Sequence, residues 1–312
     1  MLKIEDSVQA IKDSTASVHE ALGKLTDAFN VKEIDEHLRR IHKWLDAPDP
    51  SSNHVVALGK REVTTGSWFI GGSAFAKWKE SPNSILWLHS IPGGGKTILS
   101  STIIQACHEH CNSQRNSNKE QKVAPIWAVA YFYFDFADTL KQDYSKMLRS
   151  LIKQLSEQLR YTSDALEKLF NDSTTGSGQT PTDEILLQTL GQIVDEFDQV
   201  YIVIDALDEC VQRLPLLDGI SEMHEGWGHD VLHLLVTSRY EHDIISEFEV
   251  LIEPTEEIHI HKNFIEADIR AYIYSRLQSD RRLKRWQKDT QVQLTIATTL
   301  TQKADGMYVY IS

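Results

Sequence analysis

Five short stretches of the chain are rich in Ile, Val, Leu and aromatic residues, without a clean alternation of apolar and polar positions. This pattern is typical of strands that are buried on both faces. The stretches are Ile85–His89, Ile126–Asp135, Val200–Asp205, Val231–Thr237 and Ile258–His261. Helical patterns lie between them, over Lys96–His110, Asp143–Leu159 and Thr182–Phe197. Strands separated by helices predict parallel β–α–β units, and hence an α/β fold with a doubly wound, five-stranded parallel sheet.

A helical segment precedes the predicted sheet. Apolar residues recur in it at alternating steps of four and three, with Thr15 the one polar member. The positions are Ile4, Val8, Ile11, Thr15, Val18, Leu22, Leu25 and Phe29. This heptad spacing allows two interpretations: a coiled coil for self-association or an effector partner, or a helix packed on its own domain. A second helix follows, with an apolar face that ends at Leu45. The Pro- and Ser-containing stretch 46–53 is predicted to be a linker.

The pattern divides the chain into three parts. Residues 1–46 are expected to form an N-terminal helical segment, and residues 54–262 the domain that contains the sheet. Residues 263–312 have a helical pattern, which predicts the start of a further helical domain that is truncated. Two polar stretches within the central domain, Asn112–Lys122 and Asn171–Thr180, are predicted to be surface loops.

A glycine-rich loop links the first predicted strand to the first helix, in the sequence ILWLHSIPGGGKTILSSTII. Gly93–Gly95 let backbone N–H groups converge on a phosphate, and the N-terminus of the next helix points at the same phosphate. Lys96 can reach the β- and γ-phosphate oxygens, and Thr97 offers a hydroxyl to Mg²⁺. The strict pattern G-x-x-x-x-G-K-[ST] has glycine where this chain has Ser90. The arrangement predicts a site for ATP or GTP with magnesium.

Charged residues follow two other predicted strands. Asp205 ends the strand in VYIVIDALDEC, at the edge where open α/β sheets bind ligands, and its carboxylate can hold Mg²⁺. Asp208 and Glu209 come next, and one of them can orient or deprotonate the attacking water. Alternatively, these two acids only begin the next helix, where they favour its dipole. Arg239, at the end of VLHLLVTSRY, is either a contact for the γ-phosphate or half of a surface ion pair.

Composition excludes several classes of protein. The net charge of −13 argues against a general nucleic-acid-binding protein, which needs a basic face. The three cysteines lack the even number and the spacing of a disulfide framework, and the N-terminus lacks a secretory segment. The longest apolar stretch, IWAVAYFYF, is too short to span a bilayer. A cytoplasmic protein without a membrane span is expected.

Two weaker signals also allow more than one interpretation. In CHEHC, residues 107–111, the two cysteines share a helix face but the histidines do not. Because zinc needs about four converging ligands, no metal site is expected there. The basic run Arg281–Trp286 is either a surface for a partner or a solvated helix face.

The motifs together resemble the NACHT class of signal-transducing (STAND) P-loop ATPases, in its fungal NOD-like receptor branch, a domain also described as nephrocystin-like. The matching stretches are WLHSIPGGGKTILSSTII, AYFYFDF, VIDALDEC, VTSR, TTGSWF, EADIRAYI and KADGMYVY. The acidic strand is the most specific of them, because the small residue Ala206 separates the aspartate from the acids that follow. The resemblance extends from about Trp44 to the C-terminus.

The resemblance implies a strand order of 5-1-4-3-2 and a set of functional residues. The implied nucleotide-binding residues are Pro92, Gly93, Gly94, Gly95, Lys96, Thr97 and Ile98, with Arg61, Thr65 and Gly66 near the base. It further implies that Thr97 and Asp205 serve the metal, Asp208 and Glu209 the water, and Arg239 the γ-phosphate. Family members also carry an N-terminal effector, winged-helix elements and C-terminal repeats, so a chain that stops at Ser312 reads as a fragment or a short form.

Two functions remain open at this stage. The leading interpretation is a regulatory ATPase switch that binds ATP or ADP (GTP is less favoured), hydrolyses ATP slowly and controls oligomerisation in fungal non-self recognition or cell death. The alternative is a scaffold that nucleotide stabilises without turnover. A small-molecule kinase is weaker, because the sequence shows no clear arginine-bearing lid.

Overall fold

The computed structural model of the chain describes residues 36–304, apart from residues 63, 118–125, 160, 176–177 and 229. The heptad seam predicted over Ile4–Phe29 lies outside the described residues, as does most of the stretch KADGMYVY. Residues 36–45 are helical and belong to the second predicted N-terminal helix.

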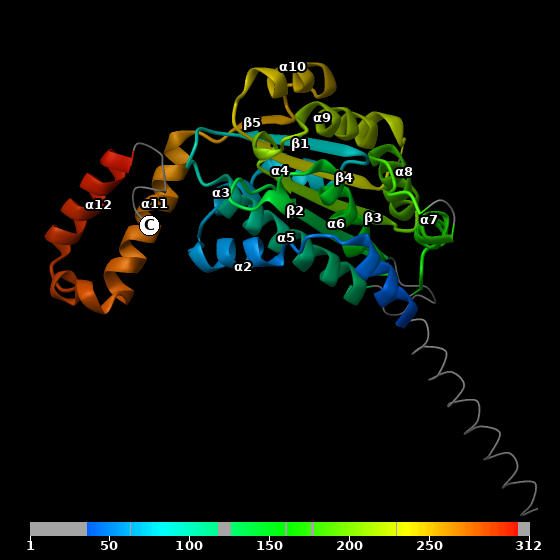
Figure 1. Cartoon of the computed structure of the whole chain (residues 1–312). Coiled ribbons are helices and arrows are strands. Elements are labelled where there is room, and N and C mark those ends of the chain that lie inside the picture. Colours follow the sequence, from blue (N-terminus) through cyan, green and yellow to red (C-terminus); the bar gives the residue numbers. More distant parts are fainter. Residues whose placement is uncertain are drawn as a thin grey trace, which may run out of the picture.

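Five parallel strands form the sheet at the centre of the described chain (Figure 1). They are β1 (Ser84–His89), β2 (Trp127–Tyr133), β3 (Gln199–Asp205), β4 (Leu232–Ser238) and β5 (Glu257–His259). The order across the sheet is β2-β3-β4-β1-β5, which is the order that the family resemblance implies. Strands β1 and β4 are buried along their whole length, and β3 along all but its first residue. The predicted five-stranded parallel sheet is confirmed.

Helices connect the strands and extend beyond them. The α-helices are α2 (Ser51–Lys60), α3 (Ser67–Ile70), α4 (Ser73–Glu80), α5 (Lys96–Ser117), α6 (Tyr144–Ser156), α7 (Asp164–Thr175), α8 (Asp183–Val194), α9 (Arg213–Ser221), α10 (His242–Leu251), α11 (Lys262–Ser279) and α12 (Thr290–Ala304). Shorter turns are η1 (Thr139–Lys141), η2 (Leu207–Glu209), the π-helical η3 (Glu222–Gly226) and η4 (Arg281–Trp286).

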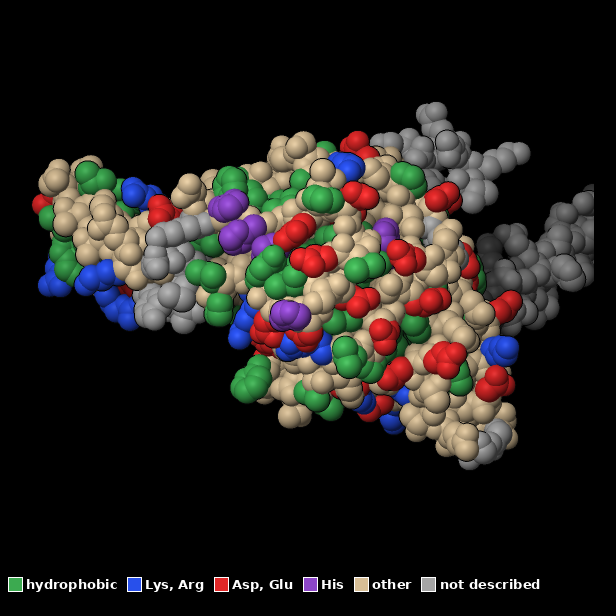
Figure 2. Space-filling model, turned by 90° about the horizontal axis from the view of Figure 1, so that it is seen from above, with side chains coloured by type: hydrophobic (Ala, Val, Ile, Leu, Met, Phe, Trp, Pro, Cys, Tyr) green, Lys and Arg blue, Asp and Glu red, His purple; other side chains and the backbone are tan. Residues whose placement is uncertain are grey.

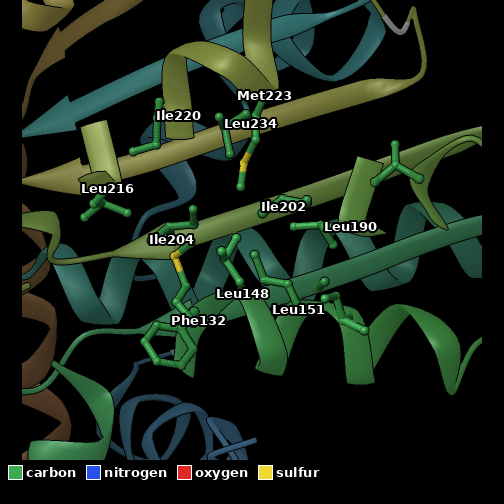
Figure 3. Close-up of a cluster of buried hydrophobic side chains, with 14 of the residues drawn as sticks. Phe132, Leu148, Leu151, Leu190, Ile202, Ile204, Leu216, Ile220, Met223 and Leu234 are labelled. Atoms are coloured by element: carbon green, nitrogen blue, oxygen red, sulfur yellow. The ribbon is translucent and has the colours of Figure 1, made fainter. Parts of the chain in front are cut away.

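Alternate residues of each strand face opposite helical layers. In β3, Ile202 and Ile204 face one apolar core, whereas Tyr201 and Val203 face the other. The first core lies between the sheet and α6 to α10. Figure 3 shows side chains of this core that come from the strands and from the helices and meet between them. The second core lies between the sheet and α3, α4, α5 and α11. A sheet covered on both faces is the doubly wound architecture that the sequence predicts.

Two of the predicted loops are shorter than expected. Helix α5 continues to Ser117 and so occupies half of the stretch Asn112–Lys122. No Gly or Pro interrupts the helix there, and the buried side chain of Cys111 anchors it to the core. Helix α7 runs to Thr175, inside the predicted loop Asn171–Thr180.

The predicted linker over residues 46–53 is also too long. Helix α2 begins at Ser51, where the carboxylate of Asp49 accepts hydrogen bonds from the backbone N–H and the hydroxyl of Ser51, both at 2.8 Å. Such a side-chain acceptor satisfies the free N–H groups of a first helical turn. A helix therefore starts within a stretch whose Pro and Ser content indicated only a linker.

Helices α11 and α12, with η4 between them, project from one end of the sheet (Figure 1). Residues Ile265, Ile269, Ile273 and Leu277 recur every four positions on α11 and are buried, so this helix packs one face into the second core. Lys and Arg side chains gather on the projecting part, whereas Asp and Glu side chains are spread over the part that contains the sheet (Figure 2). No helix in the described ranges is long and apolar enough to cross a membrane.

Candidate functional site

The glycine-rich loop joins the end of β1 to the first turn of α5. Gly93 and Gly95 have left-handed φ angles of 73° and 79°, which glycine adopts without a steric cost. A Cβ on Gly94 would lie 2.6 Å from Ser90 Oγ. The buried Ser90 hydroxyl donates to the carbonyl oxygen of Ile91 at 3.2 Å. The chain therefore accommodates serine at the first glycine position of the strict pattern by keeping glycine at position 94.

The ammonium group of Lys96 lies against this loop. Its Nζ donates to the backbone carbonyl oxygens of Ser90 at 3.3 Å and of Ile91 at 3.5 Å. Burial lowers the pKa of Lys96, and the carboxylates of Asp208 and Asp205 oppose that shift. The lysine is thus a half-buried cation held at the loop by neutral acceptors, which a phosphate group can replace.

Asp205, at the end of β3, is 1% exposed and is surrounded by hydroxyl groups. Thr97 Oγ1 donates to its Oδ2 at 2.7 Å. Ser100 Oγ and Thr237 Oγ1 donate to its Oδ1 at 2.6 Å and 2.8 Å. Burial raises the pKa of the Asp205 carboxyl group, and these three hydrogen bonds lower it. The two predicted metal ligands, Thr97 and Asp205, are therefore in direct contact.

The oxygen atoms of Thr97 and Asp205 fit a hard cation such as Mg²⁺. Within the described ranges, no group of three or more His, Cys, Asp or Glu side chains is arranged to hold a metal ion. A magnesium ion at this pair consequently needs further oxygen ligands. Water and nucleotide phosphates supply such ligands in most magnesium sites of this kind.

The chain turns sharply after Asp205. Ala206 has a left-handed φ of 61°, a conformation that is costly for bulky or β-branched residues. Its N–H donates to Thr237 Oγ1 at 3.0 Å, which fixes the turn to the end of β4. The turn leads directly into η2, which carries Asp208 and Glu209.

Asp208 pairs with Arg239 across the ends of β3 and β4. The backbone N–H of Arg239 donates to Asp208 Oδ1 at 2.8 Å, and Arg239 Nε lies 3.0 Å from Oδ2. The Asp208 side chain is 2% exposed, whereas that of Arg239 is 45% exposed. Asp208 therefore anchors Arg239 here, although the sequence analysis places it beside the attacking water. A contact between Arg239 and a γ-phosphate stays a prediction.

Glu209 is held by the segment that follows β2. Its Oε2 accepts a hydrogen bond from the backbone N–H of Phe136 at 2.7 Å. Burial raises the pKa of Glu209, the Phe136 N–H lowers it, and the charges of Asp208 and Asp205 raise it further. Of the two acids predicted to act on water, Glu209 is thus the one that forms no ion pair with a described residue.

These groups surround a cleft of about 640 Å³. All the loop residues predicted to bind nucleotide line it, namely Pro92, Gly93, Gly94, Gly95, Lys96, Thr97 and Ile98. Ala206, Asp208, Glu209 and Arg239 line it as well. The sequence motifs of three separate strands therefore meet at one site, at the carboxyl edge of the sheet.

The lead-in residues Arg61, Thr65 and Gly66 are not among those that line the cleft. The backbone N–H of Gly66 instead donates to Asp268 Oδ2 on α11 at 3.1 Å. A Cβ on Gly66 would also lie 2.8 Å from the Leu99 side chain on α5. Contacts between these three residues and a base stay a prediction.

Sequence reasoning missed a second wall of the cleft. It consists of Ser52, Asn53, Val56, Ala57 and Lys60 on α2, Asp135, Asp138 and Lys141 after β2, and Tyr272 on α11. Asn53 Nδ2 donates to Asp135 Oδ2 at 2.8 Å, and the Lys141 ammonium donates to Asn53 Oδ1. One available signal was the position of Asp135, directly after the aromatic strand in AYFYFDF, at the same sheet edge as Asp205.

Residues 64–239 match the family described as Nephrocystin 3, N-terminal. This match covers more than half of the 312 residues. The chain belongs to this family.

A curated relative is similar over a larger part of the chain. The vegetative incompatibility protein HET-E-1 of Podospora anserina is 23% identical over 251 residues, which cover 78% of this chain and 17% of that protein. The chain therefore spans about a sixth of the length of this relative. Together with the nephrocystin family match, this similarity confirms the resemblance to a fungal, nephrocystin-like P-loop domain.

Solved structures with a similar fold come from more distant proteins. The Orc1 protein of Aeropyrum pernix, solved in complex with DNA, is 10% identical with a TM-score of 0.41, over 71% of this chain and 55% of that one. A Walker-type ATPase of Pyrococcus abyssi is 9% identical with a TM-score of 0.41, over 78% of this chain and 75% of that one. These likenesses concern the fold alone.

Replacing Gly94 with alanine tests the geometry of the loop. Its Cβ would meet Ser90 Oγ at 2.6 Å and the backbone carbonyl oxygen of Ile91 at 3.1 Å, so the Ser90 side chain and the loop both have to shift. Overpacking of this kind costs about 1–3 kcal/mol, so we expect Gly94→Ala to weaken binding of magnesium ATP roughly 5- to 150-fold. Isothermal titration calorimetry measures the change.

Two further variants control this experiment. Gly59→Ala adds a Cβ on exposed α2 with nothing within 4 Å, and we expect it to bind as the parent does. Adding Ser90→Gly to Gly94→Ala removes the clashing hydroxyl and should recover part of the affinity. An unchanged affinity of Gly94→Ala would contradict the described loop geometry.

Proposed function

We propose that this chain is the nucleotide-binding module of a signal-transducing regulatory protein, which takes ATP or ADP with Mg²⁺ and hydrolyses ATP slowly. GTP is the less favoured nucleotide. The observation that carries the proposal is the convergence of Lys96, Thr97 and the Gly93–Gly95 loop in one cleft, with the buried Asp205 bonded to Thr97 directly behind it. Each supplies a different part of what a triphosphate with magnesium requires: a cation, metal ligands and backbone donors.

Different groups in the cleft contribute different interactions to nucleotide binding. The N-terminus of α5 favours anions through the helix dipole, and the backbone N–H groups of Gly93 and Gly95 are donors for phosphate oxygens, whereas the Gly94 N–H donates to the carbonyl oxygen of Ile91. Lys96 exchanges the carbonyl oxygens of Ser90 and Ile91 for phosphate oxygens. Thr97 and Asp205 would hold Mg²⁺, which would neutralise negative charge on the phosphates during hydrolysis.

Glu209 is the proposed general base. It lies in the cleft and forms no ion pair within the part of the chain that the structure describes. Burial raises the pKa of its carboxyl group, which strengthens it as a proton acceptor. The backbone N–H of Phe136 donates to Oε2 of this carboxylate, so Oε1 is the oxygen that we propose to accept the proton of the attacking water.

A nucleotide-stabilised scaffold without turnover is the second candidate function. It is favoured by the same contacts, because Glu209 is bound to Phe136 and Asp208 to Arg239. Both functions share the binding site and differ only in hydrolysis. Single-turnover hydrolysis of ATP with and without Mg²⁺ separates them, since only the first yields ADP at a magnesium-dependent rate.

The biological role is inferred from the relative named above. That relative is a vegetative incompatibility protein, so we propose a role for this chain in fungal non-self recognition or cell death, as a cytoplasmic protein. The helices predicted before residue 36 would form the contacts for self-association or for binding an effector. The bound nucleotide, ATP or ADP, would control this assembly. Sedimentation of the chain with ADP or with a non-hydrolysable ATP analogue tests that control.

Lys96→Ala is expected to abolish nucleotide binding and to leave the fold intact. Alanine leaves the β- and γ-phosphates without their cation in a partly buried site, and such charge-assisted contacts are the strong ones. Calorimetric titration with ATP measures the loss, and the exposed Lys77→Ala on α4 is the matched control. Binding by Lys96→Ala equal to that of the parent would contradict the assignment of the loop.

Asp205→Asn and Glu209→Gln are expected to fail in different ways. Asp205→Asn should weaken magnesium-dependent binding, because it removes a metal ligand. Glu209→Gln should retain binding and slow hydrolysis, typically 10²- to 10⁴-fold for a lost general base. Binding and single-turnover rates are measured for both, with the exposed Glu249→Gln as control. Hydrolysis by Glu209→Gln at the parent rate would show that Glu209 is not the general base.

A further inference from the structure

The cleft has two ends, and the order of the strands across the sheet distinguishes them. The acids that mark the γ-phosphate side, Asp205, Glu209 and Asp135, follow β3 and β2. These strands lie on one side of β1, whose loop binds the phosphates. Helix α11 follows β5, which is the edge strand on the opposite side of β1. A nucleotide whose γ-phosphate faces the acids therefore extends its nucleoside toward α11.

Tyr272 lines the α11 end of the cleft. Among the described lining residues it is the only aromatic side chain. It also borders an apolar groove between α11 and α12, so it forms part of the wall that separates the two hollows. The guanidinium carbon of Arg276, one turn further along α11, lies 5.7 Å from the centre of the Tyr272 ring.

The position of Tyr272 is set by the docking of α11 onto residues 61–70, which precede α4 and are called the lead-in segment below. The rings of Trp68 and Phe264 are stacked, with centroids 4.3 Å apart and planes within 8°. One turn before Tyr272, the carboxylate of Asp268 accepts the hydrogen bond from the Gly66 N–H. Residues four apart lie on the same helix face, so this bond holds the face that carries Tyr272.

Gly66 makes this docking possible through its lack of a side chain. Its φ of 75° is left-handed, and a Cβ there would lie 2.8 Å from Leu99 on the loop helix α5. Gly66 thus leaves room for the Leu99 side chain of α5 and donates its N–H to α11. Burial raises the pKa of the Asp268 carboxyl group to about 6, and the Gly66 N–H opposes that shift. The lead-in segment therefore ties the phosphate-binding helix to the helix that carries Tyr272.

We propose that Tyr272 stacks on the base of the bound nucleotide and that Asp268, through Gly66, is the residue that positions it. This inference rests on the proposed function, and it adds the residue that contacts the base. In this arrangement the lead-in segment acts by holding α11 in place, and it does not contact the base directly. Because stacking uses the π-face that every base has, Tyr272 contributes affinity and little choice between adenine and guanine.

The test compares a full nucleotide with its phosphate part alone. Binding of ATP, GTP and inorganic tripolyphosphate, each with Mg²⁺, is measured by calorimetry for the parent chain, Tyr272→Ala, Tyr272→Leu and Tyr272→Phe. Loss of base stacking weakens binding roughly 5- to 150-fold. We expect that loss for ATP and GTP in the Ala and Leu variants, no loss for tripolyphosphate, and near-parent binding for Phe. The Leu variant keeps apolar volume on α11 if the Ala variant does not fold.

Tyr274→Ala and two Asp268 variants complete the experiment. Tyr274 lies on the same helix and does not line the cleft, so its variant should bind all three ligands as the parent does. Asp268→Ala removes the acceptor for the Gly66 N–H and should weaken ATP binding while sparing tripolyphosphate. Asp268→Asn keeps an acceptor and should restore most of the ATP affinity.

The possible failures are distinguishable. If the Ala and Leu variants of Tyr272 bind ATP as the parent does, the base contact is wrong while the proposed function stands. Equal weakening of ATP and tripolyphosphate shows that Tyr272 acts on the phosphate loop or on the fold, which also overturns the inference. If the parent chain binds neither ATP nor tripolyphosphate, the proposed function fails and the inference fails with it.

Discussion

The carboxylate of Asp205 accepts hydrogen bonds from Thr97, Ser100 and Thr237, and the rest of the site depends on this contact. The three hydroxyl groups come from the first turns of α5 and from the end of β4, whereas the carboxylate ends β3. A buried carboxylate is costly unless it is hydrogen-bonded. The three bonds meet that requirement and at the same time fix two strands and the loop helix relative to one another.

The other functional groups are positioned from this fixed point. Thr237, which bonds Asp205, also holds the turn at Ala206, and that turn directs η2 across the cleft. Asp208 in η2 then anchors Arg239, two residues beyond Thr237. The cation at the end of β4 and the acids at the end of β3 therefore share one network. A change at any of these residues is expected to reach the others through hydrogen bonds shorter than about 3 Å.

The sequence predicts the parts of the site that follow from local pattern. Apolar runs without alternation predict the sheet, and the positions of the glycine loop and Asp205 after two such runs predict their meeting at the carboxyl edge. The pairing of Asp208 with Arg239 is not visible in the sequence, because it depends on the neighbouring positions of β3 and β4. Tyr272 was missed for a similar reason, since its helix lies far along the chain from the loop that it faces.

Short helices are the other part that pattern reasoning does not reach. Helix α3 has four residues and α4 has eight, too few for a helical period to stand out. Helix α2 begins inside a Pro- and Ser-containing stretch, where composition indicates a linker. Its role as a wall of the cleft comes from tertiary contacts such as that between Asn53 and Asp135. This hydrogen bond joins residues 82 positions apart in the sequence, and no local sequence pattern encodes it.

Nucleotide binding in the cleft above Asp205 is proposed to require magnesium. Calorimetric titration of the unaltered chain with ATP, in the presence of Mg²⁺ and again with a chelator, measures this requirement. We expect a single nucleotide per chain, bound more tightly with Mg²⁺ than without it. A folded chain that binds no ATP up to millimolar concentration, or that binds it with an affinity independent of magnesium, would show that the proposed nucleotide site is wrong.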